Sequence, residues 1–268
     1  MWSAQNPKLH RLRHYIAHFF RSKRRGHGVH SPFVYRLCEE VFYNSASFYK
    51  EAELDHIRQT LGRDQRILES PDLGAGSTHF RTNARTVADI VRHGISKPKQ
   101  SRILFHLIRH LNCRLIIELG TSLGLNTLYL AAANPSGKVY SLEGSPALVN
   151  FASNLAQDAN LTNIEFREGH FDLTLPELLK TLNRVDLVYV DGNHSKEATL
   201  RYFYAILEKV QDDSVLVFDD IYWSAGMTEA WHAIQKEPAV RLSIDTYYMG
   251  LVFFRKDILT KQQFSLFI

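Results

Sequence analysis

Between residues 114 and 255 the chain alternates short apolar runs with amphipathic stretches, and this alternation restricts the fold more than any other feature. The apolar runs predict strands at 114–119, 138–142, 163–167, 185–190 and 214–218. Helical patterns separate them at about 124–133, 145–158, 173–182 and 195–209. Such alternation predicts an α/β fold, doubly wound, with a mostly parallel sheet and helices on both faces.

The end of this region predicts a change of strand direction. After a helical pattern at 225–236, two apolar runs at 240–245 and 251–255 are joined by a short connection. The connection cannot hold a crossover helix, so we expect the pair to form an antiparallel C-terminal hairpin.

The first 95 residues indicate helices and loops instead. Helices are expected at 8–20, from Pro32 to about 41, at 51–61 and at 84–93, and residues 96–101 open another helix that continues to 111. The glycine-rich stretch 70–77 is expected to be a loop, because Ile67 and Leu68 are too few for a convincing preceding strand. We therefore expect a helical N-terminal extension over 1–95, on the substrate side of a main domain at 96–268.

The cysteine content and the lengths of the apolar runs indicate in which cellular compartment to expect the protein. Cys38 and Cys113 are the two cysteines and show no spacing typical of a disulfide framework or a thiolate metal site. The first residues carry no apolar core like that of a signal peptide, and no apolar run reaches the roughly 18–20 residues of a membrane span. We expect a cytoplasmic protein without a membrane span.

The N-terminal segment is strongly basic. No acidic residue precedes Glu39, whereas eight lysines and arginines do, and apolar residues recur at helical spacing within 8–20. Three interpretations stay open: a packed helix with a solvated basic face, a contact with a nucleic acid or acidic substrate, and a membrane-surface helix. The cluster is short, which disfavours a nucleic-acid partner. His10, His14 and His18 share a helical face among arginines, which favours solvation over metal binding.

A glycine-rich turn after the first strand predicts a ligand site. Residues 116–131 read as an apolar run ending in Glu118, a turn bracketed by Gly120 and Gly124, and a helix. This arrangement presents backbone N–H groups and a helix N-terminus to a polar ligand. Glu143 closes the next strand about 20 residues after the glycines, where a carboxylate can accept both hydroxyls of a ribose. The sequence therefore predicts a nucleoside cofactor.

The spacing of the glycines in this turn distinguishes between several classes of ligand-binding and catalytic motif. It lacks the third-place glycine of a dinucleotide fingerprint and the lysine of a phosphate-binding loop. Gly120-Thr-Ser122-Leu-Gly124 does fit the nucleophile elbow of serine hydrolases, with Asp191 or Asp219 and then His232 following in hydrolase order. That elbow normally follows several strands and an oxyanion loop, which this sequence lacks. A structural turn without a ligand is disfavoured by Glu143.

Three carboxylates follow two later strands. Asp191 ends the strand at 185–190, and Asp219 and Asp220 end the strand at 214–218, where ligands bind in open parallel sheets. Three such groups would repel one another unless a ligand neutralises them, and their oxygens suit Mg²⁺. Asp191-Gly192 is also an ordinary turn pair, and Asp219 could hold a cofactor amino group or cap a helix. His194 could be a general base or a helix-start residue beside Ser195.

The motif Glu118-x-Gly120-x-x-x-Gly124 resembles motif I of the class I S-adenosylmethionine-dependent methyltransferases. Asp191, Asp219 and Asp220 resemble the carboxylates of metal-dependent O-methyltransferases, including catechol-type enzymes and bacterial sugar and macrolide enzymes. The Asp191-Gly-Asn-His194 form is closer to the sugar-modifying group. The resemblance covers about residues 96–255 and implies a Rossmann-like, seven-stranded methyltransferase fold.

The resemblance also implies an activity and site roles. The cofactor would be S-adenosyl-L-methionine, Mg²⁺ would bind Asp191, Asp219 and Asp220, and Asp191 or His194 would accept the proton from an oxygen acceptor. The implied cofactor contacts are Ser96, Glu118, Gly120, Thr121, Ser122, Gly124, Asn126, Glu143, Gly144, Ser145, Gly169, His170 and Asp191. We expect O-methyl transfer to a small-molecule hydroxyl, with a homodimer compatible with the sequence. A catalytically silent cofactor-binding protein is the alternative.

Overall fold

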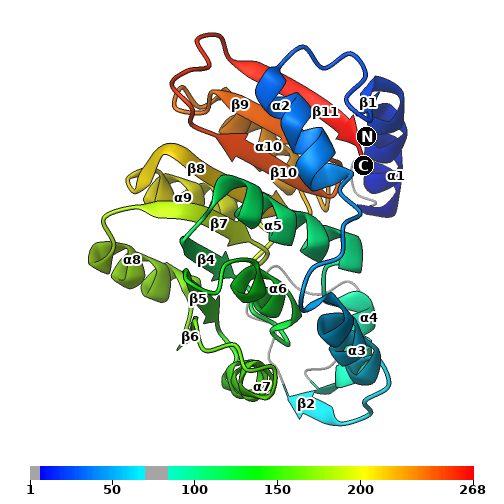
Figure 1. Cartoon of the computed structure of the whole chain (residues 1–268), viewed down its shortest axis with the longest axis vertical. Coiled ribbons are helices and arrows are strands. Elements are labelled where there is room, and N and C mark those ends of the chain that lie inside the picture. Colours follow the sequence, from blue (N-terminus) through cyan, green and yellow to red (C-terminus); the bar gives the residue numbers. More distant parts are fainter. Residues whose placement is uncertain (1–6, 70–83) are drawn as a thin grey trace. The chain divides into compact units, whose positions relative to one another are not determined.

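The computed structural model describes residues 7–69 and 84–268 (Figure 1). The expected loop at 70–77 lies outside the described residues. By internal packing the chain divides into two units, one of residues 1–44 with 182–268 and the other of residues 45–181. This division follows contacts and does not test the functional boundary at residue 95, which stays a prediction.

The described part of the unit of residues 45–181, the glycine-loop unit, contains three parallel strands with helices before, between and after them. Its helices are α3 (Glu51–Leu61), α4 (Val87–His93), α5 (Pro98–Leu111), α6 (Leu125–Ala133), α7 (Pro146–Asp158) and α8 (Phe171–Thr181). Its strands are β2 (Ile67–Glu69), β3 (Ala84–Thr86), β4 (Leu115–Leu119), β5 (Lys138–Glu143) and β6 (Ile164–Glu168). Strands β4, β5 and β6 are neighbours in that order and pair in parallel. Strands β2 and β3 form a separate antiparallel pair.

An apolar cluster attaches the N-terminal helices of this unit to the turn after β4. Leu61 of α3 and Val87 and Ile90 of α4 pack with Leu123, Leu125 and Leu148. Leu123 belongs to the turn itself and is fully buried. The turn is therefore anchored to this cluster through the Leu123 side chain.

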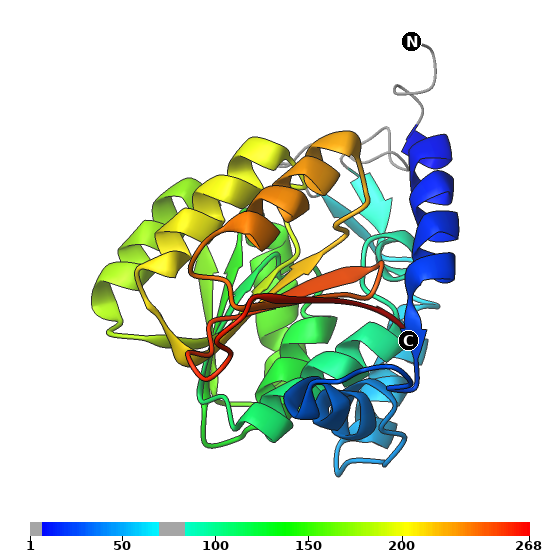
Figure 2. The ribbon, with the colours of Figure 1, turned by 90° about the horizontal axis from the view of Figure 1, so that it is seen from above.

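The unit of residues 1–44 and 182–268, the carboxylate unit, joins the two ends of the chain. Its helices are α1 (Pro7–Arg21), α2 (Pro32–Leu37) with a π-helical continuation (Cys38–Phe42), α9 (Lys196–Leu207) and α10 (Ala225–Lys236). Its strands are β1 (Lys23–Arg24), β7 (Val185–Val190), β8 (Val210–Asp219), β9 (Leu242–Asp245), β10 (Met249–Phe253) and β11 (Gln262–Phe267). Helices α9 and α10 pack together, and Figure 2 shows them side by side on one side of the strands.

The strand directions in this unit confirm the expected hairpin. Strands β7 and β8 pair in parallel, whereas β10 is antiparallel to both β8 and β9. Strand β11 then pairs in parallel with β9, and β1 pairs in parallel with β11. Helix α1 packs beside β11, so an early helix and the last strand of the chain lie side by side in one unit (Figure 2).

The mostly parallel, Rossmann-like fold is confirmed, but four details of the expectation are wrong. Within the described residues, β4–β6 and the six strands of the carboxylate unit make nine strands instead of seven, because β1 and β11 extend the expected set. Residues 84–86 form a strand instead of a helical turn, and 67–69 is its partner. Strand β8 begins at 210 instead of 214. Within 7–69 and 84–268, no helix combines the length and apolar character that a bilayer span requires.

Candidate functional site

The turn between β4 and α6 is held in a shape that glycine makes possible. Gly120 and Gly124 have φ values of +103° and +81°, in the left-handed region that favours glycine. A Cβ on Gly124 would lie 2.8 Å from the Cβ of Ala152 in α7, too close for an undisturbed contact. Ser122 between them is also left-handed, with φ +51°. The close approach of α7 therefore requires glycine at position 124 as much as the turn does.

Glu143 at the end of β5 lies against this turn. Its Oε2 accepts a hydrogen bond from the Ser122 N–H at 2.9 Å, and its Oε1 accepts one from the Ser145 N–H at 3.0 Å. Burial raises the pKa of Glu143, while these backbone N–H groups act in the opposite direction. The backbone N–H groups of Thr121 and Gly144 also act on this carboxylate, so Glu143 is held in place by the turn and by the segment that follows β5. The predicted pair of glycine turn and carboxylate is thus brought together.

Glu118 is buried beneath the same turn. Its Oε2 accepts hydrogen bonds from the Thr127 hydroxyl at 2.5 Å and the Ser141 hydroxyl at 2.6 Å. Burial raises its pKa to about 7, and its Oε1 is buried without a hydrogen-bond partner among the residues that the structure describes. An orphaned carboxylate oxygen is costly and is the kind of atom that a bound ligand donor would satisfy. The residue that motif I singles out therefore has unused acceptor capacity.

Two further predicted contacts meet although they lie apart in the chain. The Asn126 amide Nδ2 donates to the Ser96 Oγ at 2.9 Å, and the Ser101 hydroxyl donates to the Asn126 Oδ1 at 2.5 Å. Asn126 stands in the first turn of α6, and Ser96 precedes α5. All three side chains are buried, and Asn126 is the residue that contacts both Ser96 and Ser101.

The remaining predicted contacts of this unit lie near the ends of β5 and β6. The Gly169 N–H donates to the Glu143 carbonyl at 2.9 Å, and Gly169 has φ +134°. The Ser145 Oγ is buried without a partner among the described residues. His170 is exposed and lies 3.5 Å from Asp172 through its Nδ1. The structure therefore offers polar atoms from both strand ends, while the ligand roles of these residues stay predictions.

In the carboxylate unit, a tyrosine links two of the three predicted acidic residues. The Tyr189 hydroxyl lies 3.1 Å from the Asp191 Oδ2 and 2.9 Å from the Asp219 Oδ2. Asp219 is buried, and its burial together with the nearby Asp220 raises its pKa. Sequence reasoning missed Tyr189, although it lies two residues before Asp191 and so points to the same side of β7.

Asp220 has a different environment from Asp219. It is left-handed, with φ +52°, and its side chain is only partly exposed. Burial raises its pKa, while the guanidinium of Arg11 in α1 acts in the opposite direction. A non-glycine residue in this conformation is strained, and such residues often occur at functional sites.

The predicted Mg²⁺ ligands are not arranged as a metal site. Across residues 7–69 and 84–268, no three His, Cys, Asp or Glu side chains gather as potential metal ligands. The Tyr189 hydroxyl lies between Asp191 and Asp219, and its single proton can be donated to one of the two carboxylates at a time. These residues as placed do not fit the ion, and the Mg²⁺ site stays a prediction.

His194 lies beside Asp191, as its spacing suggests. Its Nε2 is 3.8 Å from the Asp191 Oδ1, and its ring centroid is 6.1 Å from that of Trp223. Asn193 at φ +51° turns the chain after β7, and the Ser195 hydroxyl accepts from the Ala198 N–H at the start of α9. The helix-start role therefore belongs to Ser195 and not to His194.

Comparison with known proteins agrees with this arrangement. Residues 117–221 match a family described as "Methyltransferase domain". The chain is 29% identical over 146 residues to a catechol O-methyltransferase of Mycobacterium tuberculosis, and 27% identical over 143 residues to one of Niastella koreensis. These matches cover 54% and 52% of this chain and 64% and 63% of the relatives, so less than two thirds of either relative is represented.

Solved structures show the same fold at low sequence identity. An O-methyltransferase from Bacillus cereus, described as a complex with SAH, superposes with a TM-score of 0.54 at 19% identity, covering 79% of this chain and 93% of that one. An SAH-bound methyltransferase from Podospora anserina gives a TM-score of 0.55 at 16% identity, covering 80% and 100%. The Rossmann-like fold expected from the motifs is confirmed, and residues 117–221 are similar to the methyltransferase domain family, as the motifs indicated.

Proposed function

We propose that this protein is an S-adenosylmethionine-dependent methyltransferase that transfers a methyl group to a hydroxyl oxygen of a small molecule. The observation that carries the proposal is the Glu143 carboxylate resting on the glycine turn, within the matched methyltransferase domain. The names of the two relatives support an oxygen acceptor, and the SAH-bound neighbours support the cofactor. The silent-protein and serine-hydrolase alternatives gain no support.

The residues of the glycine-loop unit fit this cofactor. Glu143 would accept the ribose hydroxyls, the turn from Gly120 to Gly124 would hold the amino-acid portion, and Ser96 with Asn126 would donate to its carboxylate. Gly169 and His170 would border the adenine. The orphaned Oε1 of Glu118 supports the fit, because it could accept from a cofactor donor directly or through a water. When bound, S-adenosylmethionine supplies an electrophilic methyl group, which leaves alignment and deprotonation of the acceptor to the protein.

The carboxylate unit supplies candidates for the deprotonation. The proton of the acceptor hydroxyl would pass to an oxygen of Asp191 or to the Nε2 of His194, which lie 3.8 Å apart. Tyr189 would act as a positioning residue, since its hydroxyl holds the Asp191 carboxylate in place. No step is assigned to a metal ion. The small-molecule acceptor, a possible homodimer and a cytoplasmic location belong to the same proposal.

Replacing Glu143 tests the cofactor assignment directly. Each charge-assisted hydrogen bond contributes about 1.5–3 kcal/mol, so Glu143→Ala should weaken S-adenosylmethionine binding by tenfold or more. The measurement is titration calorimetry with S-adenosylmethionine and its demethylated product. Glu165→Gln is the matched control, because Glu165 is a partly exposed carboxylate of β6 that pairs with Arg167. Unchanged affinity in Glu143→Ala would show that the cofactor assignment is wrong.

Turnover separates an enzyme from a silent binding protein. Release of demethylated cofactor should be measured with a panel of phenols, catechols and sugars. Methylation of one class by the native protein, lost in Asp191→Asn, would support the proposed roles. Tight cofactor binding without turnover on every acceptor would favour the silent alternative.

A further inference from the structure

A cavity of about 400 Å³ lies within the carboxylate unit and opens onto Asp220. Its walls come from α1, from the segment after β8 and from the turn between β9 and β10. Five of its lining residues are aromatic: Tyr15, Tyr222, Trp223, Tyr247 and Tyr248. The volume is within the range of small-molecule sites. His194 lies against Trp223, so a candidate proton acceptor stands beside the same wall.

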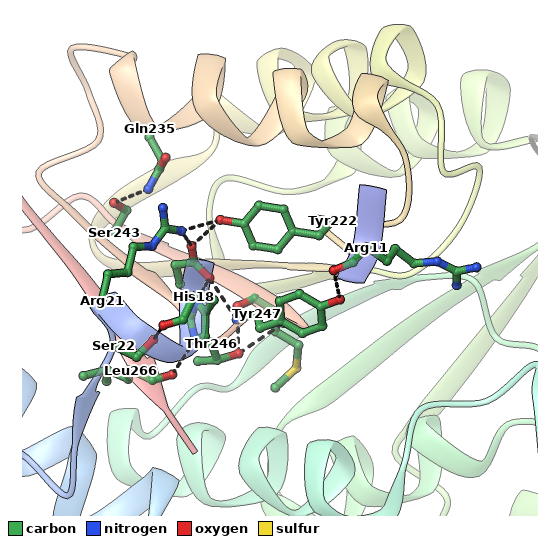
Figure 3. A network of polar contacts seen from close by, with 12 residues as sticks. Arg11, His18, Arg21, Ser22, Tyr222, Gln235, Ser243, Thr246, Tyr247 and Leu266 are labelled. Carbon is green, nitrogen blue, oxygen red and sulfur yellow. Dashed lines mark hydrogen bonds and ion pairs between the residues drawn. The ribbon is translucent and has the colours of Figure 1, made fainter. Parts of the chain in front are cut away.

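The aromatic walls are held in position by specific contacts. Tyr222 and Tyr247 stack with centroids 5.4 Å apart at 22°, and Tyr15 and Tyr248 meet Tyr247 edge-on at 5.1 and 5.0 Å. The Tyr222 hydroxyl donates to Asp245 at 2.6 Å. Tyr247 has φ +72°, a strained conformation for an aromatic residue, yet its N–H donates to Asp245 and its hydroxyl to the Arg11 carbonyl (Figure 3). Preorganised rings of this kind favour a planar ligand.

Arg11 is the basic side chain of this cavity. Its guanidinium lies over the Trp223 ring at 4.5 Å, and its Nε donates to the Pro7 carbonyl at 3.4 Å. Within the described part of the chain, neither terminal amino group of Arg11 makes a hydrogen bond or a close ion pair, although the charge of Arg11 acts on the Asp220 carboxylate. Figure 3 shows this side chain pointing away from His18 and Arg21. A half-buried guanidinium thus presents an open pair of donors at the cavity.

We propose that this cavity is the acceptor site and that Arg11 selects a planar aromatic acceptor carrying a carboxylate or similar oxyanion. This inference rests on the proposed methyltransferase function, and it adds that the acceptor substrate carries a negative charge. A guanidinium binds a carboxylate through two parallel hydrogen bonds, and stacking on Trp223 orients its plane. The aromatic walls hold the ring. The substituent would bind Arg11, and the acceptor hydroxyl would lie toward His194, which lies beside the Trp223 wall.

The test uses two probes that differ in charge and little in shape, para-hydroxybenzoate and para-hydroxybenzamide. Binding to the full chain is measured by quenching of tryptophan fluorescence and by calorimetry. The native protein should bind the benzoate at least about tenfold more tightly than the amide, and Arg11→Gln should remove this preference while leaving amide binding within about twofold. Arg11→Lys should keep part of the preference, because it retains charge without the fork. Arg13→Gln is the matched control, since Arg13 is an exposed arginine of the same helix.

The outcomes separate this inference from the proposed function. A native protein with no preference between the probes, or an Arg11→Gln variant that loses both probes equally, overturns the selection by Arg11. Failure of both probes to bind also overturns the cavity assignment. S-adenosylmethionine affinity, measured in the same Arg11→Gln protein, should be unchanged. Failure of that cofactor to bind the native protein would reject the methyltransferase proposal, and a charge preference that persisted would leave the anion site standing.

Discussion

Asp245 at the end of β9 should contribute more to stability than any surface carboxylate of the chain. Its Oδ2 accepts from Arg21 at 2.8 Å and Tyr222 at 2.6 Å, its Oδ1 accepts from the Tyr247 N–H at 2.8 Å, and the His18 Nδ1 lies 3.2 Å away (Figure 3). The Asp245 side chain is 4% exposed. These contacts attach α1 to β9 and to two walls of the cavity.

Removing the carboxylate should leave several buried donors without an acceptor. Arg21 is 49% exposed and can turn to water, but His18 and Tyr222 are buried and cannot. Breaking a buried charged cluster from one side costs about 3–5 kcal/mol. We therefore expect Asp245→Ala to lower the free energy of unfolding by that amount. Asp245→Asn should cost less, because its amide keeps one accepting oxygen.

The assay is urea denaturation followed by tryptophan fluorescence, which reports on Trp223 and Trp231 in this unit. Asp257→Ala is the matched control, because Asp257 also pairs with an arginine but is 64% exposed. Such a surface pair contributes about 0–1 kcal/mol. Equal urea midpoints for Asp245→Ala and Asp257→Ala at neutral pH would refute the reasoning.

The pH dependence gives a second readout of the same cluster. Burial alone would raise the pKa of Asp245, but the contacts from His18, Tyr222 and the Tyr247 N–H outweigh it and hold the pKa below its usual value. A depressed pKa means that the stabilisation is complete above the unfolded pKa of about 3.9 and is lost as pH falls through the folded value. The stability difference between native protein and Asp245→Asn should therefore shrink at acidic pH. A difference that grew instead would contradict the assigned sign.

Three further predictions concern the turn and the carboxylates. Gly124→Ala should lower the free energy of unfolding by about 1–3 kcal/mol in urea denaturation and weaken cofactor binding, because residue 124 has a positive φ and its Cβ would contact Ala152. The control Gly226→Ala within α10 should be neutral or stabilising. Equal effects of the two substitutions would contradict this prediction. Ser122 should stay unlabelled by a fluorophosphonate probe in mass spectrometry, since it acts through its backbone N–H, and covalent labelling would restore the hydrolase. If Asp191, Asp219 and Asp220 bind Mg²⁺, methyl transfer should stop when a chelator is added and return when the ion is restored. Cofactor binding should persist in the chelator. Full turnover in the chelator would show that the reaction needs no metal ion.

Local patterns predicted most elements of the parallel region. The helix at 51–61 and the strand at 185–190 have the expected bounds, because each carries a complete apolar period or run. Strands β1 and β2 were not predicted, since two or three residues carry no period and are stable only through a partner. Strand β11 was missed because its weak alternation, Gln262–Phe267, depends on pairing with β9 for its burial.

The residues of the candidate site also divide into those that local sequence patterns predicted and those that depend on distant partners. Glycine spacing and strand-end acids predicted the turn and Glu143, and the structure brings them together as expected. The hydroxyl of Tyr189 between Asp191 and Asp219 depends on two strands in register, which a single run of residues does not reveal. The alternation of side chains along β7 predicts which side of the strand Tyr189 faces, but it does not predict that Tyr189 also contacts Asp219.

By itself, the sequence determined the alternating α/β order, the glycine turn and the strand ends that carry acids, because these depend on neighbours within a few residues of the chain. Only the tertiary structure decided which residues share the aromatic cavity. Arg11 and Tyr247 are more than 200 positions apart, and their contact exists because α1 packs beside β11 and the Asp245 cluster holds the helix there. Burial, charge pairing and strain at such positions arise from distant partners, so no local pattern encodes them.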